Sequence, residues 1–311
     1  MDLKIIDGRR DIGLAMTIAS AVAMGLVVCI HLPTLPKGGV LEWGVPWFFF
    51  ASGFWVARSR RTVLENIKIR VKSLLLPYYL WNVIWFPILF IFNWVGWRYF
   101  GAKRVVDGSV ECIVRCMGLS PFAWPALVPT WFLRALFATV VVVGLLDWTF
   151  RQIVPMGKMF LKASVSRWLV CLLCLVMYWM WCLLGSKETL LHSFFVFGLP
   201  LGGCAWFSMG MVIREVMCAV NEKEESVALS DERSRKWREG IHRQIMPVYL
   251  IHVPVILLVG WLCKAFHCYG MLETIGGDVV MWFVSVGGAI VIGEFMRRRC
   301  PQCARLLLGG R

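Results

Sequence analysis

Ionisable side chains inside long apolar runs are the first residues of this sequence that could do chemistry. They are His31, Arg134, His252 and Glu294, with His192 at the edge of such a run. An ionisable group in hydrocarbon is costly, so each of them is a functional candidate by default. An imidazole titrates near neutral pH and suits proton transfer, whereas a guanidinium stays charged and suits the stabilisation of an anion.

Each candidate also has a simpler structural explanation. His31 and Arg134 lie near the ends of their runs, where a polar side chain can anchor a helix at the membrane interface. His252 could be a buried histidine that bonds a neighbouring helix. Glu294 is close to the three arginines that follow it and can reach the inner interface, and His192 is expected to face water on the outer side.

The elements that must position these residues are transmembrane helices. The chain has 311 residues, of which 59% are apolar and 17% charged, with a mean hydropathy of +0.69. A soluble domain is about 45–50% apolar and about 25% charged, so an ordinary soluble enzyme is not expected. Apolar runs of roughly 20 residues recur without a strand-like alternation. We predict eight spans, near 12–32, 41–57, 74–96, 130–146, 168–184, 192–213, 245–263 and 279–296.

The fold class predicted is therefore all-α, a polytopic helix bundle of eight to ten spans that forms a single membrane domain over 1–311. The second span is short and contains Glu42 and Pro46, so a re-entrant segment is its alternative. No internal repeat, nucleotide-binding glycine loop or metalloprotease motif is found. Cys300 and Cys303 form a CxxC pair without two further ligands at a suitable spacing, so no metal site is expected.

Charge gives the predicted orientation. The chain carries 33 Lys and Arg against 19 Asp and Glu, a net charge of +14. Nucleic-acid binding is one explanation of a basic chain. The basic residues instead cluster in alternate loops, with 25 on one side and seven on the other. By the positive-inside rule, both termini and the loops 58–73 and 214–243 are predicted to be cytoplasmic.

Five residue strings resemble those of a known family. The first holds His31, and the others follow in order along the predicted helices. They read VVCIH at 27–31, VPWFFFASGF at 45–54, RVKSLLLPYYLW at 70–81, TWFLRAL at 130–136 and VYLIH at 248–252. Each string alone is weak, but five in the right order are specific together. On these strings the chain resembles the acyltransferase-3 family of multi-pass bacterial membrane acyltransferases.

The resemblance implies a reaction and a cellular location. The family moves an acyl group, usually from cytoplasmic acyl-CoA, to a hydroxyl of a glycan or another envelope acceptor at the bacterial inner membrane. Acetyl is the expected group, acyl-CoA the co-substrate, and no permanently bound cofactor is expected. His31 would take the proton of the attacking hydroxyl, and an acyl-histidine intermediate is the alternative. The bilayer, the donor and the acceptor are the expected partners, with no nucleic acid, and the oligomeric state stays open.

Other residues receive roles on the same basis. A basic cluster could hold the donor's phosphates, for which arginine forks are well shaped, or could serve only as a topology signal. It consists of Arg58, Arg60, Arg61, Lys68, Arg70 and Lys72. Ser52 could donate to a carbonyl oxygen or simply allow close helix packing. Tyr249 and His252 are further candidates in the last string.

The chain departs from the family pattern at one position. The family usually has a basic residue eleven positions before the first-helix histidine, and here that position is Ser20. If the first and fourth spans adjoin, Arg134 could supply the missing cation near His31 and polarise the acyl carbonyl. Its alternatives are to reach the outer interface or to fix the loop at 121–129. Two other functions stay open: a transporter or flippase of an envelope lipid or glycan, and an inactive relative that binds glycan or a partner.

Overall fold

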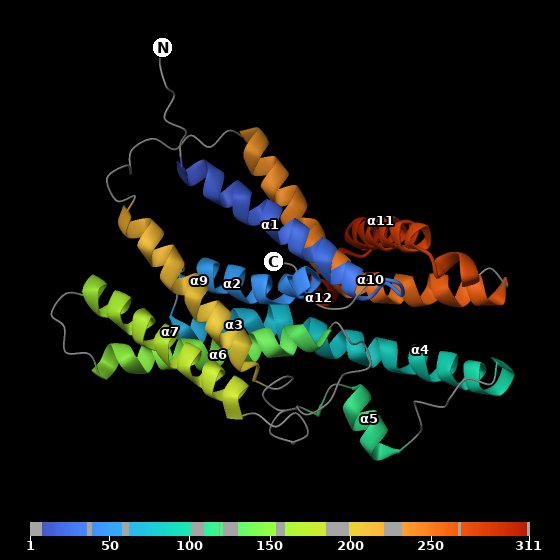
Figure 1. Cartoon of the computed structure of the whole chain (residues 1–311), viewed down its shortest axis with the longest axis horizontal. Helices are drawn as coiled ribbons and strands as arrows, with labels where there is room; N and C mark the ends of the chain where they lie inside the picture. The colour runs from blue at the N-terminus through green and yellow to red at the C-terminus, as the bar shows by residue number, and fades with distance from the viewer. Residues whose placement is uncertain are drawn as a thin grey trace, which may run out of the picture. The chain divides into compact units, whose positions relative to one another are not determined.

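A computed structural model describes most of the chain and consists of helices and connecting turns (Figure 1). The described residues are 8–35, 39–57, 62–100, 109–117, 119–120, 130–153, 159–184, 199–220, 232–266 and 269–309. No strand occurs among them. The predicted all-α class is confirmed.

Seven helices within the described ranges are long and apolar enough to cross a membrane, judged by length and composition. They cover Ile12–Ile30, Gly39–Ala57, Val63–Ile91, Trp131–Ile153, Ser164–Leu183, Glu239–Ala265 and Ile275–Arg299. Each overlaps a predicted span, including the short second one. The predicted span 192–213 is not among the seven: residues 192–198 lie outside the described part, and the helix that holds the rest carries Arg214 and Glu215.

The described residues fall into two compact units, each built from two separate parts of the chain. Unit 1 comprises Met1–Ala51 and Val216–Arg299, and unit 2 comprises Ser52–Glu215 and Cys300–Arg311. The chain passes from one unit to the other within helix α2 (Gly44–Ala57), within helix α9 (Leu201–Val220) and after Arg299. The prediction of one domain over 1–311 stays a prediction.

Unit 1 is a packed group of three long helices with two short 3-10 turns. Its elements are α1 (Gly8–Ile30), η1 (Gly39–Trp43), the first part of α2, α10 (Glu232–Ala265), η6 (Tyr269–Leu272) and α11 (Ile275–Arg299). Helix α10 packs against both α1 and α11. It changes direction along its length (Figure 1), and Pro247 and Pro254 lie inside it. Proline removes a backbone donor and crowds the preceding turn, which bends a helix.

Unit 2 contains the remaining helices. They are the end of α2, α3 (Val63–Arg70), η2 (Val71–Leu75), α4 (Leu76–Phe100), α5 (Val110–Cys116), α6 (Trp131–Ile153), α7 (Met159–Leu184), most of α9 (Leu201–Val220) and α12 (Pro301–Leu307). Helix α6 packs against α3, α4 and α7. Gly53 lies so close to α9 that an added Cβ would be 1.9 Å from the Phe207 carbonyl oxygen.

The third helical segment begins earlier than predicted. A start near 74 was expected, whereas α3 begins at Val63 and runs through η2 into α4. A capping box explains the start: the Glu65 N–H donates to the Thr62 hydroxyl at 3.3 Å, and the Thr62 N–H donates to the Glu65 carboxylate at 2.8 Å. Residues 63–73, the larger part of the segment interpreted as the loop 58–73, are thus helical. Residues 71–75 form a π-helical turn, a feature that is frequent at functional sites.

Candidate functional site

Two histidines from opposite ends of the sequence meet inside unit 1. His31 follows the last residue of α1, and His252 lies in the middle of α10. Their ring centroids are 5.2 Å apart with planes inclined by 47°. His252 is completely buried and His31 half-buried. The structure therefore brings together two of the residues singled out from the sequence.

The hydrogen bond of His252 defines which of its nitrogens is basic. Its Nδ1 lies 2.9 Å from the Val248 carbonyl oxygen, one turn earlier on α10. A carbonyl only accepts, so Nδ1 must carry the proton and the neutral ring holds its lone pair on Nε2. This buried Nε2 has no hydrogen-bond partner among the described residues. The ring thus presents a proton-accepting nitrogen within a buried site, next to His31.

Tyr249, the other candidate in the last string, lies on the same helix. Its ring centroid is 6.3 Å from that of His252, and its side chain is buried. It therefore forms part of the wall around the histidine pair.

Apolar side chains cover the pair on the side toward the C-terminal end of α10. Leu32, Leu272 and Met281 form a buried cluster, with Ile256 of α10 packed against it. Leu32 directly follows His31, and Ile256 lies one turn after His252. The contact between His31 and His252 places the end of α1 beside the middle of α10, which continues to Ala265. That His31 lies near the outer boundary of the membrane stays a prediction.

Ser20, at the position where the resemblance implies a basic residue, is buried and bonded on both sides. Its hydroxyl donates to the Met16 carbonyl at 2.8 Å and accepts from the Trp47 indole N–H at 3.1 Å. The residue is 4% exposed. It joins α1 to the first part of α2 and takes a packing role on this turn.

Arg134 lies in unit 2, near the start of α6. It donates from Nη1 to the Ser120 carbonyl at 2.5 Å, and its guanidinium carbon lies 5.6 Å from the centre of the Tyr78 ring. Residues 121–129, the loop that Arg134 was expected to fix as one alternative, lie outside the described part. His31 belongs to the other unit, so a pairing of Arg134 with His31 stays a prediction.

Unit 2 contains a second candidate site, a cavity of about 510 Å³. Its polar lining comes from Thr62 and Asn66 of α3, Asp147 and Arg151 of α6, and Arg167 of α7. All of these positions lie toward the predicted cytoplasmic ends of their helices. The predicted orientation therefore places this cavity toward the cytoplasm.

Ion pairs fix the two arginines of this cavity. Arg151 Nη2 lies 2.5 Å from Asp147 Oδ2, and Ser166 donates to the other Asp147 oxygen at 2.8 Å. Arg167 Nη1 lies 3.1 Å from Glu215 Oε1. The Nε–H groups of both arginines are buried and have no partner within the described ranges. Each guanidinium thus keeps a donor available for an anionic or carbonyl ligand.

The described members of the predicted donor-binding cluster do not line this cavity. Arg58, Arg60 and Arg61 lie outside the described residues. Lys68 and Lys72 are exposed and Arg70 is half-buried on α3 and η2, and none of these three is among the cavity residues. Ser52 is half-buried in α2 and is not a cavity residue either.

Sequence reasoning missed Arg151 and Arg167 as site residues. The basic segment 147–167 was interpreted only as a topology signal. The available sign was Asp147 four residues before Arg151, a spacing that places an acid and a base on one helix face.

A comparison with protein families decides the identity of the chain. The family model described as an acyltransferase domain matches residues 16–216, more than half of the sequence. The chain belongs to the acyltransferase-3 family. It is accordingly a multi-pass membrane acyltransferase. No curated protein and no solved structure matches it.

The extent of this acyltransferase-3 match separates the candidate residues into two groups. His31, Ser52, Arg134 and the cavity arginines Arg151 and Arg167 lie within 16–216, whereas Tyr249 and His252 lie beyond it. His252 is therefore linked to the matched part by its contact with His31 and not by the family match.

Proposed function

We propose that this acyltransferase moves an acyl group, with acetyl as the expected one, from cytoplasmic acyl-CoA to a hydroxyl of an envelope or extracellular glycan. The observation that carries the proposal is the contact between His31 and His252 in a chain of the acyltransferase-3 family. An alcohol is a poor nucleophile at neutral pH, and an imidazole of ordinary pKa is a suitable base.

The reaction needs a base that takes the hydroxyl proton and a proton donor for the leaving thiolate. His31 takes the hydroxyl proton while the oxygen attacks the thioester carbonyl. The carbon–sulfur bond then breaks, and the departing thiolate receives that proton from His31. The lone pair of His252 Nε2 accepts the second N–H of protonated His31, which stabilises the imidazolium in a buried place.

The cavity of unit 2 supports a cytoplasmic donor. Its arginines, with those expected at 58–61 just before Thr62, offer guanidinium groups for the phosphates of acyl-CoA. Arg134 remains the proposed group that polarises the acyl carbonyl, with an effect of about 3–4 kcal/mol in comparable oxyanion sites.

The deciding experiment uses the purified full chain in nanodiscs with radiolabelled acetyl-CoA and an envelope glycan extract. We expect label in the glycan, its loss in His31→Ala and its persistence in His242→Ala. His242 is a matched control because it is an exposed histidine of the same unit that contacts Thr17 at 3.0 Å instead of the pair. Label transfer that survives His31→Ala would reject the proposed base. Donor binding without any transfer by the wild type would favour an inactive relative.

A further inference from the structure

Unit 1 contains an apolar groove that the proposed reaction does not use. Its volume is about 610 Å³, and it lies along α1, α10 and α11. Met24 and Gly25 contribute from α1, Gly240, Gln244 and Val248 from α10, and Trp282 from α11. Of the residues that line it, Lys236 and Gln244 alone have a side chain that ends in a charged or amide group. An aliphatic chain fits such a lining better than a polar molecule does.

Neither histidine of the pair is among the residues that line the groove. The Trp282 indole N–H donates to the Gly25 carbonyl at 3.2 Å and so joins α11 to α1. Gly25 lies six residues before His31, which is about 9 Å along a helix. The amide-rich arm of an acyl-CoA would find few hydrogen-bonding groups here, so the groove is a poor path for the donor.

The groove has the length of one lipid chain. On α10 it extends from Lys236 to Val248, positions that are twelve residues apart, or about 18 Å of helix. One leaflet of a bilayer accounts for roughly half of a hydrocarbon core of about 30 Å. The groove begins on the predicted cytoplasmic side, where the chains of inner-leaflet lipids enter.

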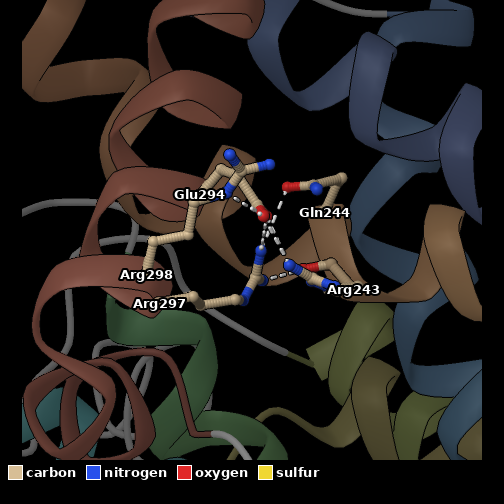
Figure 2. Close-up of polar contacts among 5 residues, drawn as sticks. All are labelled: Arg243, Gln244, Glu294, Arg297 and Arg298. Atoms are coloured by element: carbon tan, nitrogen blue, oxygen red, sulfur yellow. Dashed lines mark hydrogen bonds and ion pairs between the residues drawn. The ribbon is translucent and has the colours of Figure 1, made fainter.

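A cluster of arginines stands beside the groove. Figure 2 shows the Glu294 carboxylate between guanidinium groups of α10 and α11. Its oxygens lie 2.5 Å and 2.7 Å from Arg243 Nη2, 3.1 Å from Arg298 Nε and 3.5 Å from Arg297 Nη1. Arg297 also donates to Gln244 at 3.4 Å, and Gln244 lines the groove.

The charge of this cluster is positive. One carboxylate, that of Glu294, faces three guanidinium groups, so the cluster has a net positive charge. Lys236 and Glu239 on the preceding turns of α10 carry opposite charges and therefore do not change this net charge. The side chains of Arg243 and Arg298 are 50% and 76% exposed. Basic sites between helices on the cytoplasmic side suit the phosphates of anionic lipids.

We propose that this groove binds an anionic phospholipid of the inner leaflet, with one acyl chain along α1, α10 and α11 and its phosphate on Arg243 and Arg298. The lipid fills the space between the helices and holds α10 against its neighbours. It is a ligand separate from the acyl donor and the acceptor.

Native mass spectrometry of the purified full chain tests this assignment. The protein is titrated with phosphatidylglycerol and with phosphatidylcholine of the same acyl chains. We expect one phosphatidylglycerol to bind at least tenfold more tightly than phosphatidylcholine. Equal affinities of the wild type for the two lipids would overturn the proposal.

Two variants separate the groove from the cluster. In Gly240→Leu the new side chain enters the groove, and because an added Cβ there has nothing within 4 Å, the helix can accept it. This variant should lose both lipids, while Gly287→Leu, whose Cβ is equally free on α11 outside the groove, should bind as the wild type does.

The double variant Arg243→Gln with Arg298→Gln tests the cluster and leaves Glu294 paired to Arg297. It should reduce the preference for phosphatidylglycerol over phosphatidylcholine to about one. Unchanged lipid binding in Gly240→Leu, a loss in Gly287→Leu, or a retained preference in the arginine variant would each contradict the assignment.

Discussion

The Nε2 nitrogen of His252 is the atom that, in the proposed reaction, stabilises protonated His31. Its ring is held by a hydrogen bond from Nδ1 to the Val248 carbonyl, 2.9 Å away. The bond fixes the tautomer, and burial keeps water from competing for the lone pair. We therefore expect His252 to assist His31 without contact with bulk solvent.

His252→Asn tests this role. The asparagine amide can still donate to the Val248 carbonyl, but it offers no basic nitrogen where Nε2 lies. We expect kcat to fall by about 10²-fold, a typical effect of proton-transfer groups, with the KM for the donor unchanged. The pH–rate profile should also shift, because His31 loses the acceptor that stabilises its protonated form. An unchanged kcat and profile would leave His252 a purely structural residue.

The two histidines show how far sequence reasoning reaches at the residue scale. Each was identified from its place inside an apolar run, because an ionisable group there is costly. Their contact was not foreseen, since 221 positions separate them and periodicity says nothing about which helices adjoin.

Helix α2 shows what glycine does at the scale of an element. Gly53 faces α9 at a distance that leaves no room for a side chain, with 1.9 Å between an ideal Cβ and the Phe207 carbonyl oxygen. Small residues allow this close approach between membrane helices. The sequence string around Ser52 and Gly53 suggested such packing, but it did not name α9 as the partner.

Gly53→Ala should therefore destabilise the protein by at least about 1–3 kcal/mol, as overpacking usually does. The opposing atom is backbone, so relief requires α2 and α9 to separate. Thermal unfolding in detergent measures the effect as a lower midpoint. Gly287→Ala is the matched control, because its Cβ meets nothing within 4 Å. Equal midpoints of the two variants would refute the close contact.

Helix α3 is an element whose start the sequence did indicate, although the prediction did not use that signal. The capping signal Thr62 and Glu65 was present in the sequence, yet the basic residues after it were interpreted as a loop because charge is typical of loops. A short charged helix that leads into an apolar helix has the same run of charged residues as such a loop. The capping box decides between the two, since it satisfies backbone donors that only a helix leaves open.

For the whole molecule, the main prediction is its orientation in the membrane. The basic residues favour cytoplasmic termini. Cys300 and Cys303 are exposed and follow the last predicted span, so they should be protected from a membrane-impermeant thiol reagent added to intact cells. A permeant reagent should label them. The comparison is made between the wild type and a Cys300→Ser, Cys303→Ser variant, whose signal should differ only with the permeant reagent. A difference with the impermeant reagent would reverse the topology.

The arrangement of unit 1 also affects the order in which its parts form during synthesis of the chain. His31 leaves the ribosome 221 residues before His252, and chains grow at about 5–20 residues per second, so roughly 10–45 s pass between the two. During that interval α1 is already synthesised, while the helix that buries and completes its histidine is absent. The histidine pair therefore forms only after nearly the whole chain has been inserted. A chain that stops before α10 contains the proposed base without its partner, and synthesis of α10 is itself a condition for a complete pair.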